Sequence, residues 1–230
     1  MATLLLATRN AHKVQEIRII LTGRFSYLTL KDFPDAPKTI EDAGSFAGNA
    51  TKKSVELANW LSANASLKRD AENAFVLADD SGLEVDVLNG APGVYSARFA
   101  GGGNGNTPDA ANNEKLLRLL EDVAPEKRTA RFRCVLAVTP VISRRAETQS
   151  PVCLASEAEL RTEIFEGACE GHIAFAASGH DGFGYDPLFV PNGFDKSFAE
   201  LGEAEKNKIS HRAKALEQLN RRLQCVLNPA

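Results

Sequence analysis

Apolar positions along this chain follow two different spacings, which predicts strands interspersed with helices. Short apolar runs, and runs in which apolar and polar residues alternate, predict strands over residues 3–7, 75–78, 83–87, 130–138, 159–165, 172–176 and 188–190. Apolar positions three and four residues apart predict helices over about residues 14–21, 46–61, 107–120 and 203–223. Because both kinds of element are mixed and helices stand near both ends, we expect an α/β fold.

Turn and capping signals divide the chain without marking a linker. Asn89-Gly90 is typical of a tight turn, and Thr107-Pro108 predicts a helix start with proline at the first helical position. The glycine-rich run 100–106 predicts a mobile surface loop rather than a domain boundary. No repeat or long Pro/Ser linker interrupts the sequence, so we expect residues 1–230 to form a single, two-lobed domain.

Composition and charge exclude several classes of function. Of the 230 residues, 27 are Lys or Arg and 30 are Asp or Glu, which gives a net charge of −3. Such a chain is no polycation, so we expect no nucleic-acid partner. No apolar run reaches the roughly 18–20 residues of a membrane helix, and residues 1–7 lack the basic start of a signal peptide. We therefore expect a cytoplasmic protein without a membrane partner.

The four cysteines lack the paired spacing of a zinc site; they are Cys134, Cys153, Cys169 and Cys225. In a reducing compartment such residues act as small core hydrophobes. We assign them no chemical role.

The first candidate site is the loop between the first strand and the first helix, Thr8-Arg9-Asn10-Ala11-His12-Lys13. The start of a helix presents unpaired backbone N–H groups and a partial positive charge, which suit a phosphate group. Thr8 and Asn10 add short polar side chains, and Lys13 adds a full charge. The same residues also suit an ordinary helix cap followed by a solvated lysine. The glycine-rich pattern of a P-loop is absent.

The second candidate is the pair Asp79-Asp80, which ends an apolar strand. Adjacent carboxylates repel each other, and a divalent cation such as Mg²⁺ relieves that repulsion by binding their oxygens. One of the pair would alternatively polarise a water molecule as a general base. Glu41 is a further possible ligand, which sequence alone does not bring to Asp80. The alternative interpretation is a solvent-exposed aspartate turn.

The third candidate is the loop over residues 178–187, where three glycines surround two aromatic residues, Phe183 and Tyr185. Glycines allow close approach to a ligand, and an aromatic face suits a flat heterocycle. The alternative is that both rings anchor the loop in the core.

The fourth candidate is the basic stretch 206–212 within the last predicted helix. Lys208 and Arg212 are four residues apart, so their like charges share a helical face and favour an anion between them. A solvated basic face is the alternative. His211 lacks the Cys or acidic neighbour that would mark a catalytic triad.

Together the four candidates provide what a Mg²⁺–nucleoside triphosphate needs, namely a phosphate-binding helix start, metal-binding carboxylates, basic residues and an aromatic loop. On this evidence the sequence closely resembles the inosine triphosphate pyrophosphatase family. The matching stretches occur in the family's order and span nearly the whole chain; they are residues 7–13, 79–86, 90–98, 183–187 and 205–212.

The resemblance implies roles for residues in the first half of the site. The segment similar to the family's triphosphate cradle comprises Thr8, Arg9, Asn10, Ala11, His12 and Lys13, and Lys53 adds a second neutralising charge. Glu41 and Asp80 resemble the Mg²⁺ ligands, and Asp80 also resembles the base toward the attacking water. Ser81 is similar to a substrate-contacting hydroxyl.

The resemblance also implies how the base is bound. The loop similar to the base-binding loop comprises Phe183, Gly184, Tyr185 and Asp186. The residues similar to those that read the purine edge are Lys206, His211 and Arg212. A donor such as Arg212 would pair with the 6-oxo group of inosine or xanthosine, whereas the 6-amino group of adenine would leave that donor unpaired. Guanine has the same 6-oxo group, so another contact must reject its 2-amino group.

Members of this family are elongated α/β proteins with a long twisted mixed sheet, a site between two lobes and a homodimeric state. The implied reaction converts a non-standard purine nucleoside triphosphate (ITP, dITP or XTP) and water into the monophosphate and pyrophosphate. Mg²⁺ is the implied cofactor, and a small-molecule nucleotide is the implied partner.

Two positions and one segment depart from the family pattern. Gly48, in Phe46-Ala47-Gly48-Asn49-Ala50, stands where the family usually has glutamate, and Arg9 stands where many members have glycine. Residues 64–73 form an insertion, which we expect to lengthen a surface loop.

Two alternative functions stay open at this point. One is a pyrophosphatase of the same chemistry that acts on pyrimidine or methylated nucleotides, against which Ser210-His211-Arg212 argues. The other is a nucleotide sensor without turnover; Gly48 favours it, and the intact Lys13, Glu41 and Asp80 oppose it.

Overall fold

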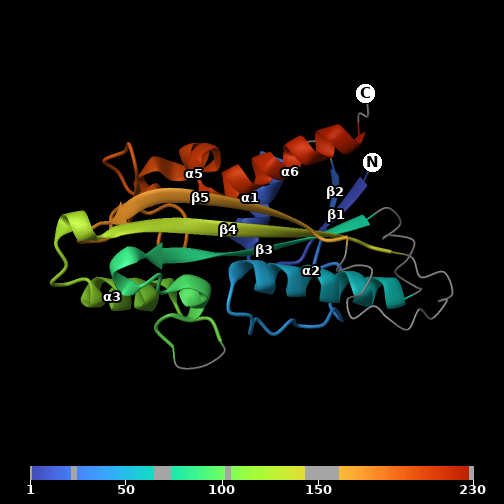
Figure 1. Cartoon of the computed structure of the whole chain (residues 1–230), viewed down its shortest axis with the longest axis horizontal. Coiled ribbons are helices and arrows are strands. Elements are labelled where there is room, and N and C mark those ends of the chain that lie inside the picture. Colours follow the sequence, from blue (N-terminus) through green and yellow to red (C-terminus); the bar gives the residue numbers. More distant parts are fainter. Residues whose placement is uncertain (1, 22–24, 65–73, 102–104, 143–160, 228–230) are drawn as a thin grey trace. The chain divides into compact units, whose positions relative to one another are not determined.

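A computed structural model describes residues 2–21, 25–64, 74–101, 105–142 and 161–227, with side chains as far as residue 223. Most of the predicted insertion 64–73, part of the glycine-rich loop and Cys153 lie outside the described residues. Within them, the chain forms six strands and five α-helices, joined in part by short 3₁₀ turns (Figure 1). The predicted α/β class is therefore confirmed.

The six strands form one mixed sheet in the order β2-β1-β3-β4-β5-β6. Their bounds are β1 Ala2–Leu6, β2 Phe25–Thr29, β3 Ala74–Val85, β4 Thr129–Pro140, β5 Glu163–Ile173 and β6 Phe189–Pro191. β1 pairs in parallel with both β2 and β3, whereas β5 pairs antiparallel with β6. Parallel neighbours require a long connection between strands, and α1 and α2 provide it here.

The helices flank this sheet (Figure 1). Their bounds are α1 Ala11–Ile20, α2 Phe46–Ala63, α3 Asp109–Leu119, α5 Phe198–Ile209 and α6 His211–Leu227. Three short 3₁₀ turns, η2 Asp86–Leu88, η3 Gly93–Arg98 and η4 Pro125–Lys127, complete the described elements. None of the described helices combines the length and the apolar character that a bilayer crossing requires.

Contacts divide the chain into two compact units. The first comprises residues 1–80 and 135–165, and the second comprises residues 81–134 and 166–230. The chain passes from one unit to the other inside β3, β4 and β5. A crossing within a strand has no Pro-, Gly- or Ser-rich signature, so composition gives no sign of it.

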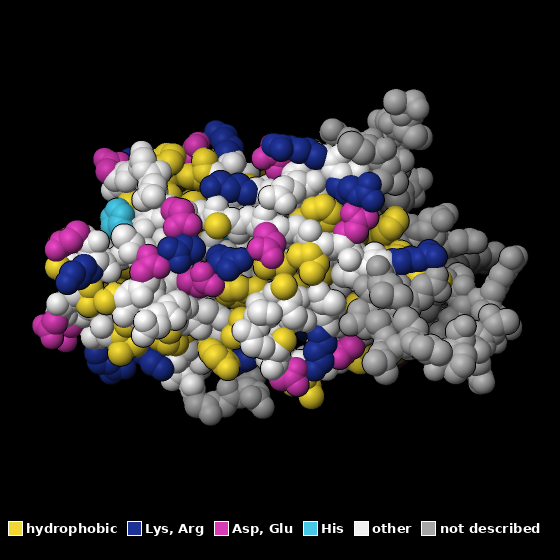
Figure 2. Space-filling model, viewed as in Figure 1, with side chains coloured by type: hydrophobic (Ala, Val, Ile, Leu, Met, Phe, Trp, Pro, Cys, Tyr) yellow, Lys and Arg dark blue, Asp and Glu magenta, His cyan; other side chains and the backbone are white. Residues whose placement is uncertain are grey.

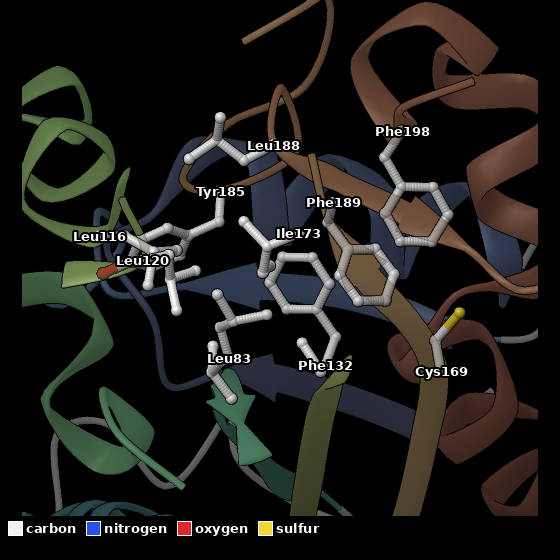
Figure 3. Packing of buried hydrophobic residues seen from close by; sticks show 12 residues of the cluster. Leu83, Leu116, Leu120, Phe132, Cys169, Ile173, Tyr185, Leu188, Phe189 and Phe198 are labelled. Carbon is white, nitrogen blue, oxygen red and sulfur yellow. The ribbon is translucent and has the colours of Figure 1, made fainter. Parts of the chain in front are cut away.

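Each unit has its own hydrophobic core. In the first unit, α2 contributes Leu57, Ala58 and Leu61, which pack with residues of β1 and β3 such as Leu5 and Val76. In the second unit the core is rich in aromatic rings (Figure 3). Its labelled members are Leu83, Leu116, Leu120, Phe132, Cys169, Ile173, Tyr185, Leu188, Phe189 and Phe198.

The described cysteine side chains, Cys134 and Cys169, are both buried and carry free thiols. Burial raises the pKa of the Cys169 thiol to about 11. The thiol therefore stays protonated near neutral pH, as expected for the core residue that the sequence predicts.

Two predicted strand breaks are absent from the structure. Residues 79–82 continue β3 without a turn, so the separate strands predicted at 75–78 and 83–87 are one strand that ends at Val85. Buried ion pairs allow this, because they neutralise the two aspartates. Likewise β5 runs unbroken over Glu163–Ile173 where the pattern predicts strands at 159–165 and 172–176.

The long helix predicted over 203–223 is two helices. Ser210 has extended backbone angles, and its hydroxyl accepts a hydrogen bond from the N–H of Ala213, so it begins α6 as a cap. α5 starts earlier than predicted, at Phe198, because Ser197 and Glu200 form a capping box. The prediction that Lys208 and Arg212 share a helical face is therefore wrong.

The predicted start of the third helix is displaced by one residue. Pro108 occupies the cap position before α3, rather than the first helical position. The hydroxyl of Thr107 does not cap the helix and donates instead to Oδ1 of Asn112 at 2.7 Å. The tight turn at Asn89-Gly90 is confirmed, with both residues at positive φ.

The strand predicted over residues 130–138 is confirmed as β4, and one face at its start is polar. Arg131 contacts Asp86 at 2.9 Å and Glu170 at 3.0 Å, and Arg133 contacts Glu166 at 2.9 Å. Figure 2 shows basic and acidic side chains interspersed on the visible face rather than gathered by sign. Such neighbouring pairs are partly exposed, so each contributes little stability.

Arg128 is a buried guanidinium whose hydrogen bonds join segments distant in sequence. Its side chain is 2% exposed and donates to the carbonyl oxygens of Leu120, Val123, Ile173 and Ala174. Carbonyl partners for all three guanidinium nitrogens satisfy a group that is costly to bury. Arg128 therefore fixes the end of β5 against the end of α3 in the second unit.

We predict that Arg128→Met lowers the free energy of unfolding by about 3 kcal/mol, because buried carbonyl oxygens lose a charged donor. Arg128→Lys should not restore the parent's free energy of unfolding, since one ammonium cannot reach all four carbonyl oxygens. Urea unfolding measures the effect, and exposed Arg118→Met, expected within about 0.5 kcal/mol of the parent, is the control. Equal effects at the two positions would contradict this assignment.

Candidate functional site

The loop after β1 is built around an asparagine cap. The side chain of Asn10 accepts hydrogen bonds from the N–H groups of His12, at 2.9 Å, and Lys13, at 3.2 Å. The N–H of Asn10 in turn donates to the hydroxyl of Thr8 at 3.2 Å. Asn10 is thus the helix cap that the sequence allowed for, while Arg9, Ala11 and His12 are exposed around the start of α1.

The two adjacent aspartates lie buried on β3, each with its own lysine. Lys13 of α1 pairs with Asp79, and Lys53 of α2 pairs with Asp80 at 2.8 Å. Lys53 also donates to the backbone oxygen of Asp79 at 2.8 Å. The two carboxylates are only 2% and 6% exposed as residues, which excludes the solvent-exposed turn. The lysine charges offset the cost of burying them.

Glu41 reaches the same group from the segment before α2. Its carboxylate lies 3.7 Å from the ammonium of Lys53. Asn49 of α2, fully buried, accepts from the N–H of Ala43 at 3.0 Å and donates to Asp80 at 3.3 Å. The structure therefore brings together Lys13, Glu41, Lys53 and Asp80, residues that sequence alone could not place side by side.

Burial dominates the electrostatics of Asp80. It raises the pKa of the Asp80 carboxyl above its ordinary value; nearby Lys53 and Lys13 act in the opposite direction, and Glu41 reinforces the rise. A carboxylate with a raised pKa is a stronger proton acceptor than an ordinary aspartate, which suits a general base.

The donor set of this group fits a hard divalent cation that arrives with phosphate oxygens. Within the described part of the chain, no three Asp, Glu, His or Cys side chains form a ready-made metal cluster. Glu41 and Asp80 provide two carboxylates around one cationic ammonium. Mg²⁺ is commonly held by one or two carboxylates together with substrate phosphates and water. The residues present therefore suit a cation bound jointly with a phosphate ligand.

The second unit contains a separate group centred on the aromatic ring of Phe183. The ammonium of Lys206, from α5, lies 4.3 Å from the centre of this ring and 2.6 Å from a carboxylate oxygen of Asp186. The same oxygen accepts the N–H of Phe183 at 2.8 Å. One buried ion pair thus fixes the ring and the loop that carries it.

Arg212 and His211 open α6 beside this loop. Arg212 is 1% exposed, its guanidinium carbon lies 5.9 Å from the centre of the Phe183 ring, and it donates to the hydroxyl of Ser81 at 2.9 Å. His211 stacks on Phe132 with ring centres 4.8 Å apart. The basic residues predicted here are therefore buried, and the solvated basic face is excluded for Lys206 and Arg212.

Tyr185 anchors the loop in the core, as one of the two sequence interpretations proposed. Its hydroxyl donates to the backbone oxygen of Ser96 at 2.9 Å. Burial raises the pKa of this hydroxyl well above its ordinary value, so the group remains a donor. The hydroxyl of Ser96 accepts from the N–H of Leu83 at 2.9 Å and donates to the oxygen of Gly93 at 2.6 Å. Ser96 thereby connects the loop to β3 near Ser81.

Sequence reasoning missed the two residues of α3 that hold Gly184. Asp109 accepts the N–H of Gly184 at 2.7 Å, and Asn113 donates to its carbonyl oxygen at 3.0 Å. Asp109 and Asn113 are four residues apart and therefore face the same side of the helix. Gly184 has φ +63°, a conformation that favours glycine. The spacing Asp-x-x-x-Asn after Pro108 was the available signal, but nothing in the sequence connects it to a loop 71 residues away.

Comparisons with known proteins identify relatives over nearly the full chain. The model of the Ham1 family matches residues 4–222. A dITP/XTP pyrophosphatase of Desulforamulus reducens is 44% identical over 216 residues, covering 94% of this chain and 92% of the relative. A dITP/XTP pyrophosphatase of Listeria innocua is 43% identical, with 97% of this chain and 95% of the relative covered.

Solved structures agree with this result. A HAM1 protein from Coxiella burnetii matches with a TM-score of 0.77 at 34% identity and covers 97% of this chain and 99% of its own. The Staphylococcus aureus Ham1 protein gives a TM-score of 0.73, also at 34% identity, with 96% and 98% covered. The resemblance inferred from the motifs is confirmed.

We predict that, without a divalent cation, the thermal midpoint of Asp80→Asn gains on that of the parent protein as the pH rises. Because burial raises the pKa of Asp80, the fold favours the neutral carboxyl, and ionisation above that pKa costs stability; asparagine removes this cost. Differential scanning calorimetry in EDTA measures the change.

Asp42→Asn is the matched control for this measurement. A hydrogen bond from Lys52 lowers the pKa of the exposed Asp42 carboxyl, so its charged form is the favoured one and asparagine should bring no gain. A midpoint difference between Asp80→Asn and the parent that does not grow with pH would contradict the assigned role of burial.

Proposed function

The chain belongs to the Ham1 family, and on this premise we propose that it hydrolyses the non-standard purine nucleoside triphosphates ITP, dITP and XTP to the monophosphate and pyrophosphate. The observation that carries the proposal is the buried Asp79-Asp80 pair on β3, matched by Lys13 and Lys53. Carboxylates and ammonium groups held together in a buried setting suit a charged phosphate ligand and a bound cation.

In the proposed mechanism a water molecule attacks the nucleotide directly, and no covalent enzyme intermediate forms. Asp80 accepts the proton of the attacking water, supported by its raised pKa. Lys13 and Lys53 stabilise the negative charge that develops on the pyrophosphate leaving group. The N–H groups at the start of α1, with Thr8 and Asn10, hold phosphate oxygens. Asp80 is the catalytic residue of this scheme.

Mg²⁺ is the cation that we propose, with Glu41 and Asp80 as its protein ligands. When bound, it would neutralise phosphate charge and polarise the attacking water. The contacts of both carboxylates with Lys53 support this assignment. We further propose a cytoplasmic homodimer, organised as a single two-lobed domain and without a nucleic-acid partner, on the strength of the family resemblance and the net charge of −3.

For the base, we propose that Phe183 offers its ring face and Arg212 a hydrogen-bond donor to the 6-oxo group. Both lie within one connected set of contacts that also includes Ser81, Asp186 and Lys206. An adenine 6-amino group would leave the guanidinium donor unpaired, and an unpaired buried donor can cost a large factor in specificity.

The proposal is tested by measuring pyrophosphate release from ITP, XTP, GTP, ATP and UTP, each with and without Mg²⁺. We expect rapid, Mg²⁺-dependent release from ITP and XTP and little from ATP or GTP. Asp80→Asn, the matched inactive variant, should lower the rate by at least about a hundredfold, the usual contribution of a general base.

Each other outcome of this experiment overturns part of the proposal. Turnover of UTP alone would indicate a pyrimidine nucleotide pyrophosphatase. Measurable ITP binding without turnover of any nucleotide would favour a sensor. An Asp80→Asn variant that releases pyrophosphate at the parent rate would show that Asp80 is not the base.

We also predict that Asn113→Ala raises the KM for ITP about fivefold, equivalent to the ~1 kcal/mol of one neutral hydrogen bond, with little change in kcat. The variant removes a donor to Gly184 and loosens the base-binding loop without touching Asp80. Steady-state kinetics measures the split, and exposed Glu114→Ala on the same helix is the control. A fall in kcat at constant KM would contradict a positioning role.

A further inference from the structure

Gly48 lies where α2 packs closely against the segment that carries Glu41. It is the third residue of the helix, and its N–H donates to the hydroxyl of the capping residue Ser45 at 3.1 Å. A Cβ atom at position 48 would lie 2.8 Å from the Cβ of Ala43 and 3.2 Å from the hydroxyl of Ser45. Ala43 would have to retreat by about half an ångström or more to reach the 3.4 Å at which ordinary contact begins.

The clash is not relieved by a side-chain rotation. The Cβ of Ala43 is attached directly to the backbone, so only the backbone of this segment can move away. Gly48 itself has no positive φ, and alanine is a better helix former than glycine. Helix propensity alone therefore predicts that Gly48→Ala stabilises the helix, whereas the close packing against Ala43 predicts that it destabilises this region.

Ala43 also marks the point where this segment is tied to the buried aspartate. Its N–H donates to Asn49 at 3.0 Å, and the amide group of Asn49 donates to Asp80 at 3.3 Å. Two residues before Ala43, the carboxylate of Glu41 lies 3.7 Å from Lys53, which itself contacts Asp80 at 2.8 Å. Asn49 thus sets the distance between the backbone of the Glu41 segment and Asp80.

We propose that Gly48 and Asn49 are positioning residues that hold Glu41 beside Asp80, and that, with alanine at position 43, the absence of a side chain at position 48 is required for a divalent cation to be bound by both carboxylates. Gly48 admits Ala43 to close contact, and Asn49 holds Ala43 there by its hydrogen bond. Relative to the family's usual glutamate, Gly48 therefore does more than remove a carboxylate, because it also makes room for the side chain of Ala43. The identity of the cation rests on the proposed function; the steric argument does not.

The test compares two glycine-to-alanine variants, three and seven positions after Glu41. Gly48→Ala introduces the close contact, whereas Gly44→Ala meets nothing within 4 Å. Mn²⁺ is titrated into each protein, in the presence of a non-hydrolysable α,β-methylene analogue of ITP, and free Mn²⁺ is followed by electron paramagnetic resonance. We expect Gly48→Ala to raise the Mn²⁺ dissociation constant about tenfold, the usual effect of disturbing a residue that orients a metal ligand. Gly44→Ala should stay within about twofold of the parent.

A double variant separates this steric effect from general damage to the helix. Ala43→Gly removes the atom that a new side chain at position 48 would meet, so Ala43→Gly/Gly48→Ala should recover Mn²⁺ affinity to within about twofold of Ala43→Gly alone. Asn49→Ala should weaken Mn²⁺ binding in either background, because it breaks the link to Asp80 independently.

Unchanged Mn²⁺ affinity in Gly48→Ala, or failure of Ala43→Gly to restore it, would overturn the proposal, as would a parent protein that binds no Mn²⁺. A Gly48→Ala protein that does not fold, judged by circular dichroism, leaves the double variant and Asn49→Ala to decide. The proposed function fails on different evidence, namely a parent protein that binds Mn²⁺ with the nucleotide analogue yet releases no pyrophosphate from ITP.

Discussion

Two aspartate–lysine pairs on β3 are the interactions on which the rest of the site depends. Asp79 and Asp80 follow each other on a buried strand, and each buried carboxylate needs a cation beside it. Lys13 and Lys53 supply these cations from two different helices. The start of α1 and the middle of α2 are therefore both fixed relative to one short stretch of strand.

The loop over residues 178–187, in the second unit, is held in place by a different kind of contact. Its backbone is irregular and rich in glycine, yet hydrogen bonds from separate elements hold it: Asp109 and Asn113 from α3, Ser96 from η3, and Lys206 from α5 through Asp186. A loop fixed in this way loses little conformational freedom when a ligand binds. Under the proposed function, such rigid support of the Phe183 ring serves the discrimination between similar bases.

The sequence predicts the type and approximate place of most elements, because hydrophobic periodicity reports which face of an element is buried. It fails where a side chain changes the local rule. The pattern predicts a strand end at Asp79-Asp80, but Lys13 and Lys53 neutralise the two carboxylates and the strand continues. It predicts a helix interior at Ser210, whose hydroxyl instead caps α6. Motifs identify Lys13, Asp80 and Arg212 as candidate site residues. They say nothing of Asp109 and Asn113, whose partner Gly184 is brought near only by tertiary structure.

The chain crosses between its two units within β3, β4 and β5, and this affects how it folds during synthesis. Each unit is discontinuous, since the first needs residues 135–165 and the second needs residues 166–230. The first 165 of the 230 residues must therefore be synthesised before the amino-terminal unit has all its parts. Until β4 is available, the edge of β3 that faces away from β1 is unpaired, and an unpaired strand edge can pair with other chains. Pairing of β4 with β3 covers that edge, so it is the step that ends this exposure during synthesis.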